Sequence, residues 1–233
     1  MEKSYVAENL AAVRGRIADA CARAGRDASE VKLVGVTKTV PPERIREAIE
    51  AGLEIIGENY IQEAKSKREA LAGLPVAWHF IGHLQTNKVK TVLECCDLIQ
   101  TVDRESLAVE LDRRAAALGR KIPVLIQINI GEEETKSGAG VAQAGTLLKF
   151  CRGLDRLDVR GLMALPPFFD QPERVRPYFR RMRQLLDTLK GDAPGLIELS
   201  MGMSGDFEVA IEEGATIVRV GTAIFGRRAA ADR

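Results

Sequence analysis

The sequence predicts an α/β protein, a single (β/α)8 barrel of the TIM type with an additional helix at its amino terminus. Strand and helix patterns alternate from one end of the 233 residues to the other, and a chain of this length holds eight such units. The strand candidates are largely continuous apolar runs, which is typical of parallel strands buried on both faces. Since no linker or change of composition divides the chain, we expect one domain over residues 1–233.

The elements follow from these patterns in chain order. Apolar residues at helical spacing, from Leu10 to Cys21, predict a first helix over residues 9–24, and Gly25 is suited to its end. Eight strand candidates follow, over residues 33–38, 55–59, 77–82, 98–102, 123–130, 159–165, 198–203 and 217–225. Helical stretches lie between them, over residues 43–51, 61–72, 88–95, 105–118, 141–154, 173–189 and 207–213.

A doubly wound open sheet is the competing topology for such a pattern. That fold usually carries a glycine-rich dinucleotide turn after its first strand. Here the corresponding turn, at residues 39–42, reads Thr-Val-Pro-Pro and contains no glycine. A closed barrel is therefore favoured.

Composition narrows the classes of function. The formal net charge is +1, from 34 basic and 33 acidic residues, which argues against a nucleic-acid-binding protein. The arginine-rich run 174–183 is bracketed by Glu173 and Asp187 and contains few aromatic side chains. No run of about 18 apolar residues is present, so we expect no membrane-spanning helix. The polar amino terminus, from Met1 to Tyr5, is unlike a signal peptide, which predicts a cytoplasmic protein.

Neither the cysteines nor the histidines have the spacing of metal ligands, and we expect no metal site. His79 and His83 lie four residues apart without a carboxylate or cysteine cluster, and such histidines usually belong to the core or its rim. The four cysteines are expected to be free thiols in a reducing compartment, namely Cys21, Cys95, Cys96 and Cys151.

The first strand candidate ends on a lysine, Lys38, directly before the turn with two prolines. Barrels place their chemistry at the carboxyl ends of their strands. A lysine amine that is partly desolvated there loses its proton more easily and can act as a Schiff-base nucleophile. The alternative for this residue, taken alone, is a side chain that reaches solvent at the rim of the sheet.

Two turns that combine glycine with hydroxyl side chains follow the seventh and eighth strand candidates, where such barrels commonly bind phosphate groups. Residues 200–206 read Ser-Met-Gly-Met-Ser-Gly-Asp before a short helix, and residues 219–222 read Arg-Val-Gly-Thr. Hydroxyl groups, glycines that allow close approach and free backbone N–H groups all favour an anion. The alternative for both segments is plain turn chemistry.

A lysine and a phosphate site on neighbouring strands fit an aldehyde that carries a phosphate. Pyridoxal 5'-phosphate is such a molecule. Arg219, on the eighth strand candidate, could face its pyridine nitrogen and donate a hydrogen bond to it. The ring would then be a weaker electron sink than a ring paired with an aspartate. An ordinary arginine at the rim of the sheet is the alternative.

Six segments, in this order, resemble the pyridoxal-phosphate homeostasis protein family, whose fold is similar to the amino-terminal barrel of alanine racemase. Three of them read Val-Gly-Val-Thr-Lys at residues 34–38, Gly-Glu-Asn-Tyr-Ile-Gln-Glu at 57–63 and Trp-His-Phe-Ile-Gly-His-Leu-Gln-Thr-Asn-Lys at 78–88. The others are Gly-Leu-Met at 161–163, Leu-Ser-Met-Gly-Met-Ser-Gly-Asp at 199–206 and Val-Arg-Val-Gly-Thr-Ala-Ile-Phe-Gly at 218–226.

The resemblance implies that Lys38 forms a covalent aldimine, a Schiff base, with pyridoxal 5'-phosphate and that Arg219 faces the ring nitrogen. It also implies five further cofactor-binding residues, of which the first three hold the phosphate and the last two line the ring pocket: Ser204, Gly221, Thr222, Asn59 and Met163. The implied function is to carry or buffer the cofactor in intracellular vitamin B6 homeostasis, with apo pyridoxal-phosphate enzymes as recipients. We expect a monomer and assign no catalytic residue.

A weak amino-acid racemase is the alternative function. Racemisation needs a second acid/base on the opposite face of the substrate, and alanine racemases supply a tyrosine for it from an additional β-domain, which this sequence lacks. Tyr60 follows the second strand candidate, but a packing role is expected for it. A Schiff-base aldolase that works without a cofactor is a third possibility, though its lysine would usually lie on a later strand.

Other polar residues near the expected site have plainer interpretations. Residues 132–138 form an acidic loop after the fifth strand candidate, expected to be solvated, in which Lys136 is a candidate second amine or phosphate contact. Glu58 and Asp206 are candidates for tuning protonation in the pocket. Lys65, Lys67 and Arg68 follow the pattern of a helix face exposed to water.

Overall fold

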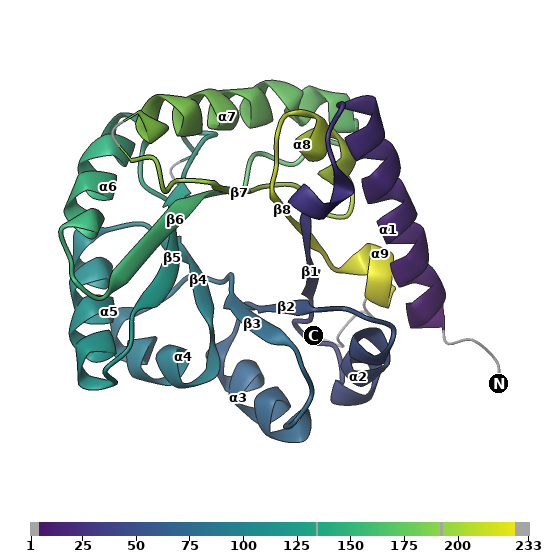
Figure 1. Cartoon of the computed structure of the whole chain (residues 1–233), viewed down its shortest axis with the longest axis horizontal. Coiled ribbons are helices and arrows are strands. Elements are labelled where there is room, and N and C mark those ends of the chain that lie inside the picture. The colour runs from purple at the N-terminus through teal and green to yellow at the C-terminus, as the bar shows by residue number, and fades with distance from the viewer. Residues whose placement is uncertain (1–4, 134, 192, 227–233) are drawn as a thin grey trace.

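The structure, a computed structural model, describes residues 5–133, 135–191 and 193–226. Eight parallel strands close into a barrel in chain order, and β1 pairs with both β2 and β8. The helices surround this ring of strands (Figure 1). The closed (β/α)8 barrel with an extra helix at the amino terminus is confirmed. Residues 1–4 of the polar amino terminus and Glu134 of the acidic loop lie outside the described ranges.

The strands are β1 (Lys32–Val36), β2 (Ile55–Glu58), β3 (Ala77–Phe80), β4 (Leu98–Val102), β5 (Ile122–Ile128), β6 (Leu157–Ala164), β7 (Glu198–Ser200) and β8 (Ile217–Val220). The α-helices are α1 (Tyr5–Arg23), α2 (Pro42–Glu50), α3 (Ile61–Ala70), α4 (Val89–Cys95), α5 (Glu105–Ala117), α6 (Ala144–Arg152), α7 (Arg176–Lys190), α8 (Phe207–Glu212) and α9 (Thr222–Phe225). Short 3-10 turns occupy Ala28–Glu30, Thr86–Lys88, Val141–Gln143 and Pro172–Val175.

The predicted eighth strand is wrong in its second half. The strand β8 ends at Val220, and the remaining residues form the short helix α9. The backbone N–H of Phe225 donates to the carbonyl of Gly221 over 2.9 Å, which is a helical hydrogen bond. An apolar run of this length fits a buried strand and a buried helix equally well, so periodicity alone could not place the boundary.

Several other strands end earlier than predicted. The strand β1 ends at Val36, which places Lys38 in the following turn rather than on the strand. The strand β7 ends at Ser200 instead of residue 203, and β3 and β5 each end two residues before the predicted limit. In each case the residues that leave the ladder are those of the loops on the carboxyl face, where active sites of such barrels form.

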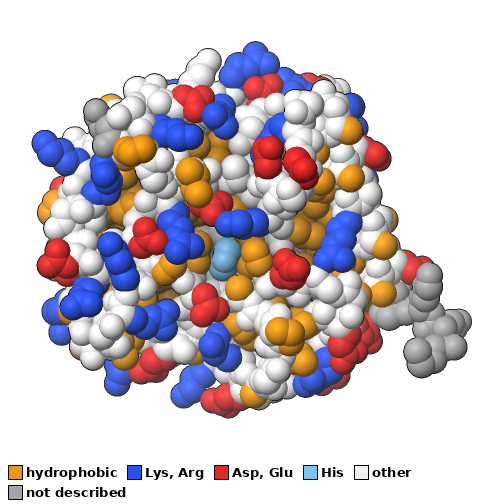
Figure 2. Space-filling view, in the orientation of Figure 1, with side chains coloured by type: hydrophobic (Ala, Val, Ile, Leu, Met, Phe, Trp, Pro, Cys, Tyr) orange, Lys and Arg blue, Asp and Glu red, His pale blue; other side chains and the backbone are white. Residues whose placement is uncertain are grey.

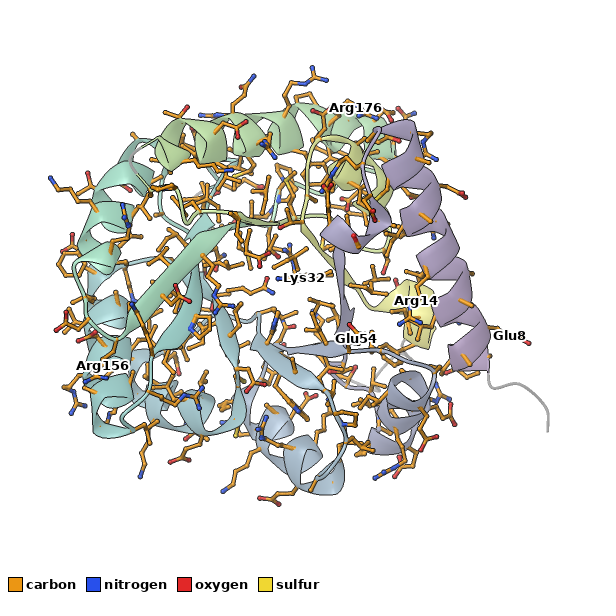
Figure 3. The ribbon with its side chains drawn as sticks, in the orientation of Figure 1. Glu8, Arg14, Lys32, Glu54, Arg156 and Arg176 are labelled. Atoms are coloured by element: carbon orange, nitrogen blue, oxygen red, sulfur yellow. The ribbon has the colours of Figure 1, made fainter. Side chains whose placement is uncertain are left out.

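The core has two parts, as the period-two alternation of strand side chains requires. One cluster lies inside the barrel, because its members come from strands on opposite sides of the ring: Val34, Leu98, Leu125, Met163 and Ile217. A much larger apolar cluster fills the space between the strands and the helices. At the amino ends of the strands, Lys32 reaches across to Glu198 of β7, with 2.5 Å between Nζ and Oε1. Figure 3 accordingly shows Lys32 over the middle of the ring.

The additional helix α1 packs beside α8 and α9 and not over an end of the barrel (Figure 1). Its apolar stripe, from Val6 to Ile17, is buried. Two side chains of α1 donate to carbonyls at the end of α9: Tyr5 Oη to Phe225 over 3.2 Å, and Asn9 Nδ2 to Ile224 over 3.0 Å. The helix therefore fixes α9 from outside. Among the helices of the described ranges, none combines the length and apolar character needed to cross a bilayer.

Candidate functional site

The predicted site residues follow strands that are neighbours in the closed barrel. The strand β8 pairs with β1, with Gly35 opposite Val220. The backbone N–H of Arg219 donates to the carbonyl of Gly202, just beyond β7, over 3.0 Å. Lys38 follows β1, and Asn59 follows β2 on its other side. Barrel closure thus gathers the ends of β7, β8, β1 and β2 at one edge.

Lys38 occupies a tight turn that starts at Thr37. The N–H of Val40 donates to the carbonyl of Thr37 over 2.9 Å, so Lys38 and Thr39 are the central residues of the turn. Thr39 has a φ of 62°, a left-handed conformation that is rare for a β-branched residue. Its N–H donates to Glu63 Oε2 over 2.8 Å, a contact that stabilises the turn. The Lys38 side chain is half-buried.

A buried ion-pair network supports this turn from the outer side of the strands. Lys67 Nζ donates to the Thr37 carbonyl over 2.7 Å, to Glu58 Oε1 over 2.8 Å and to Glu63 Oε2 over 2.9 Å. Thr37 Oγ1 also donates to Glu58 Oε1 over 2.6 Å. The expectation that Lys67 lies on a wet helix face is therefore wrong, because its ammonium group is drawn inward by two carboxylates and a carbonyl.

The pKa values of the two carboxyl groups in this network are shifted in opposite directions. Burial raises the pKa of Glu58 despite its hydrogen bonds from Lys67 and Thr37, and its Oε2 has no hydrogen-bond partner among the described residues. Burial also raises the pKa of Glu63, but hydrogen bonds from Lys67 and Thr39, together with the nearby charge of Lys38, bring it below the usual value. The Lys38 turn is thus held by one carboxyl group whose pKa is lowered and one whose pKa is raised.

Ser204 and the segment after β8 form a small polar cradle. Ser204 Oγ accepts from the N–H groups of Gly221 and Ala223, over 3.2 and 3.3 Å. A Cβ on Gly221 would lie 3.3 Å from both Cβ and the carbonyl oxygen of Val36, so β1 and the cradle are in close contact. Thr222 is the first residue of α9. The structure therefore brings together the three residues expected at the phosphate.

Arg219 lies inside the barrel, with only 3% of its surface exposed. Its Nη1 donates to Ser200 Oγ over 2.5 Å, and its Nη2 donates to the carbonyl of Ala164 over 2.8 Å. Burial lowers the pKa of Arg219 to about 10, against the opposing influence of Asp206. The guanidinium therefore keeps its charge at neutral pH and is no ordinary rim arginine.

Asn59 and Met163 occupy different surroundings. Asn59 Oδ1 is buried and, among the described residues, has no hydrogen-bond partner. Gly82 also packs directly against the Asn59 backbone, since a Cβ on Gly82 would lie 2.1 Å from the Asn59 carbonyl oxygen. Met163 is fully buried in the cluster inside the barrel, two residues along β6 from Gly161. An unpartnered buried amide oxygen is uncommon and fits a site that receives a polar ligand.

The remaining polar residues are engaged elsewhere. Lys136 Nζ donates to the Pro166 carbonyl over 3.1 Å and pairs with Glu133 Oε1 at 2.7 Å, so this loop lysine is tethered and not simply solvated. Tyr60, the residue before α3, is 56% exposed, so its side chain packs only in part. Within the described ranges, no group of three or more His, Cys, Asp or Glu is arranged to hold a metal ion.

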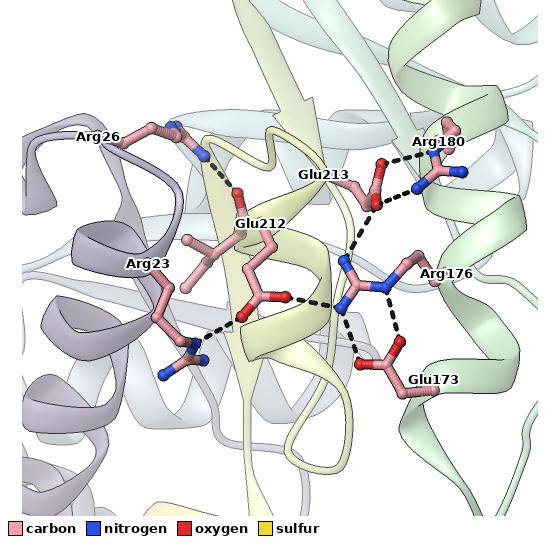
Figure 4. Close-up of polar contacts among 8 residues, drawn as sticks. Arg23, Arg26, Glu173, Arg176, Arg180, Glu212 and Glu213 are labelled. Carbon is pink, nitrogen blue, oxygen red and sulfur yellow. Dashed lines mark hydrogen bonds and ion pairs between the residues drawn. The ribbon is translucent and has the colours of Figure 1, made fainter.

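The arginine-rich run 174–183 is largely neutralised by carboxylates. Figure 4 shows Arg176 between Glu173, Glu212 and Glu213, with Arg180 on the same Glu213. The other arginines of the run pair with Glu132 and Asp187 or stack on Phe169. On the face shown in Figure 2, acidic and basic side chains are interspersed. Neither feature resembles a nucleic-acid-binding surface.

Four residues that support the site were not predicted from the sequence to do so: Thr37, Lys67, Gln100 and Ser200. Gln100 stood out in principle, because it interrupts the apolar strand Leu98–Val102 with a large amide. Buried polar side chains of this kind must find partners, so they indicate a network. Lys67 gave no such signal, since a lysine at that spacing on a helix is usually exposed.

The chain is similar to known proteins over nearly its whole length. Residues 9–229 match the family described as alanine racemase, N-terminal domain. The pyridoxal phosphate homeostasis protein of Aquifex aeolicus (strain VF5) is 50% identical over 222 residues, which cover 95% of this chain and 97% of that protein.

Solved structures give the same picture. PipY of Synechococcus elongatus PCC7942, with pyridoxal phosphate bound, is similar with a TM-score of 0.84 at 36% identity, over 95% of this chain and 100% of PipY. An alanine racemase of Clostridium difficile 630 has a TM-score of 0.70 at 14% identity, over 97% of this chain and 57% of the racemase, and this likeness shows the fold alone. The chain belongs to the family of pyridoxal phosphate homeostasis proteins, built on the barrel of the alanine racemase N-terminal domain.

Proposed function

We propose that this chain is a single pyridoxal 5'-phosphate-binding barrel domain that holds the cofactor on Lys38 and buffers it or delivers it to apo-enzymes. One observation carries the proposal: the Lys38 turn after β1 lies beside the Ser204 and Gly221 cradle after β8. The family membership and the cofactor bound to PipY support it.

The residues present fit the chemical groups of pyridoxal phosphate. The aldehyde requires a primary amine, which Lys38 offers. The phosphate requires N–H and hydroxyl donors, which the cradle of Ser204, Gly221 and Thr222 provides. The ring nitrogen requires one donor, and two contacts leave Arg219 with N–H groups to spare. The unpartnered Oδ1 of Asn59 would face a polar group of the ring, and Met163 would contribute apolar surface below it.

Pyridoxal phosphate supplies a reactive aldehyde that forms a reversible C=N bond with an amine. Lys38 would supply the amine for this bond, with one water molecule released as the C=N bond forms. The step needs no oxidant or reductant, and water reverses it. Burial lowers the pKa of Arg219 only to about 10, so the guanidinium would stay protonated and would donate to the ring nitrogen without protonating it. Such a site favours storage over strong carbanion chemistry.

The relatives carry the name of a homeostasis protein, not that of an enzyme, and we assign no catalytic residue. We further propose that the chain acts as a monomer in the cytoplasm. The support for that compartment is that four cysteines, all free and buried, persist most readily where thiols are kept reduced.

The experiment that tests the proposal is an absorbance spectrum of the purified protein with added pyridoxal phosphate, before and after borohydride, followed by peptide mass mapping. We expect a visible band that borohydride abolishes and a pyridoxyl label on Lys38. A protein that takes up no cofactor would refute the function, and a label confined to other lysines would refute the Lys38 assignment. Amino-acid racemisation by the loaded protein, at rates typical of enzymes, would refute the assignment as a carrier.

A further inference from the structure

We propose that Ser200, Gln100 and His79 are positioning residues, which hold the Arg219 guanidinium at the floor of the cofactor site without cancelling its charge. The inference rests on the proposed function for the identity of the ligand. It concerns a chain of four side chains that crosses the interior of the barrel.

The four side chains are joined by an unbroken series of hydrogen bonds. Arg219 Nη1 lies 2.5 Å from Ser200 Oγ, and Ser200 Oγ lies 2.6 Å from Gln100 Oε1. Gln100 Nε2 lies 3.0 Å from His79 Nδ1. The four residues stand on β8, β7, β4 and β3, so the chain spans the barrel from one wall to the other. A second contact, from Nη2 to the carbonyl of Ala164 on β6, fixes the orientation of the guanidinium plane.

All four side chains point into the barrel, since the residue before each one packs in the outer apolar cluster: Trp78, Ile99, Leu199 and Val218. Ser200 and Gln100 are fully buried, Arg219 is 3% exposed and His79 is 6% exposed. A buried polar group without partners is costly, so a half-formed chain would weaken the core. The chain is complete along its whole length.

Arg219 fixes the direction of every hydrogen bond in the chain. A guanidinium can only donate, so Ser200 Oγ accepts from it. The Ser200 hydroxyl must then donate its own hydrogen bond to Gln100 Oε1. The amide of Gln100 then presents its NH2 group to His79, and His79 Nδ1 must accept. The structure therefore assigns His79 to the neutral form that carries its proton on Nε2. Burial lowers the pKa of His79 to about 4, which agrees with a neutral ring.

The partners of Arg219 are neutral oxygen atoms. A carboxylate in place of Ser200 would form an ion pair and hold the guanidinium away from a ligand. The carboxyl group whose charge acts on Arg219 is that of Asp206, which accepts from the N–H of Met203 over 2.6 Å. The positive charge consequently remains available to an electron-rich ring nitrogen. The neutral partners orient the guanidinium. Because none of these contacts is an ion pair, they do not neutralise its positive charge.

The direction of the chain can be tested without any cofactor. The protein contains two histidines, so ¹⁵N NMR of the purified protein, with His83→Gln to assign the signals, reports the state of His79 directly. We expect the Nε2–H form. In Gln100→Glu, a carboxylate would face His79 and cannot donate, so a proton should appear on Nδ1. A wild-type ring protonated on Nδ1, or a His79 signal unchanged in Gln100→Glu, would overturn the assignment.

The positioning role is tested by cofactor release. Gln100→Leu and Ser200→Ala should still bind pyridoxal phosphate at Lys38 but release it at least about tenfold faster, with a displaced absorbance band, because Arg219 loses its orientation. His79→Asn keeps an acceptor near the position of Nδ1 and should stay within about threefold of the wild type. The matched control is Thr101→Val on the same strand, whose buried Oγ1 has no partner among the described residues.

The two hypotheses fail differently. Variants that release the cofactor as slowly as the wild type and Thr101→Val would overturn the positioning role while leaving the proposed function intact. A wild-type protein that takes up no pyridoxal phosphate would refute the proposed function, and the NMR result would still decide the direction of the hydrogen-bond chain. If a variant fails to fold, the wild-type NMR spectrum still tests the inference.

Discussion

At the scale of single residues, the cradle after β7 and β8 depends on two hydroxyl groups. Ser204 Oγ accepts from the N–H groups of Gly221 and Ala223, so its own O–H can donate to a phosphate, and Thr222 begins α9. We predict that Ser204→Ala and Thr222→Ala each weaken pyridoxal phosphate binding by about 1–3 kcal/mol, the range for a lost hydrogen bond to a charged group. Equilibrium titration of the visible band measures this change. Thr188→Ala, on an exposed face of α7, is the control, and unchanged affinity in the double variant would remove the cradle from the site.

A second residue-scale prediction concerns the cation buried behind the Lys38 turn. Lys67→Met leaves Glu58 buried without its partner, so we expect a loss of about 3–5 kcal/mol in the free energy of unfolding. Urea denaturation at neutral pH measures it. Lys65→Met, on the exposed side of the same helix, should change stability by less than about 0.5 kcal/mol. Adding Glu58→Gln to Lys67→Met should recover part of the loss, and equal stability of the two lysine variants would contradict the buried network.

At the scale of elements, the loop between β7 and α8 depends on a glycine. Gly202 has a φ of 91°, and a Cβ there would lie 2.6 Å from the Cβ of Ala210. Strain and overpacking together should make Gly202→Ala about 2–4 kcal/mol less stable. Gly205→Ala, three residues later, is the matched control because nothing lies within 4 Å of its Cβ position. Thermal unfolding that ranks the two variants equally would rule out this account of the loop.

The elements also show what sequence patterns could and could not predict. Eight alternating units predicted the barrel correctly, because strand periodicity and chain length leave few other topologies. The end of β8 was misplaced, since residues 223–225 are apolar in either conformation. Only the hydrogen bonds back to Gly221 and Thr222 show that Thr222–Phe225 is a helix. Lys38 was expected on its strand, but Thr39 at positive φ turns the chain just before the prolines. A threonine in the sequence does not indicate a left-handed backbone conformation.

At the scale of the whole molecule, closure of the barrel explains why the expected site residues lie close together. The residues after β1, β2, β7 and β8 must meet once β1 pairs with β8, so motifs far apart in the sequence converge. The supporting networks were not predictable in this way. Their members, such as Gln100 and Lys67, become partners only through side-chain contacts across the interior or between a helix and the sheet. The spacing of motifs predicts which strand ends are neighbours, but it does not predict which buried side chains contact one another.

The ion pairs of Figure 4 join the helices α1, α7 and α8. They make the stability of the protein sensitive to acid. A hydrogen bond from Arg176 lowers the pKa of Glu212; burial raises that of Glu213, but hydrogen bonds from Arg180 and Arg176 outweigh it. Since both pKa values lie below those of the unfolded chain, the stabilisation is present above about pH 4.5 and is lost as the pH falls through the folded-state values.

Arg176→Gln should therefore lower stability by about 1–2 kcal/mol at neutral pH, between the values for an exposed and a buried pair, and should flatten the fall in stability on the acid side. Denaturant unfolding across the range from pH 7 to about pH 3 measures both effects. Arg183→Gln removes an ion pair with Asp187 inside α7 alone, so it should leave the acid limb of the curve unchanged. If the stability of both variants fell in the same way on the acid side, the contacts from α7 to α8 would contribute nothing to holding the outer helices together. The dependence of stability on acid pH would then have to arise from the barrel.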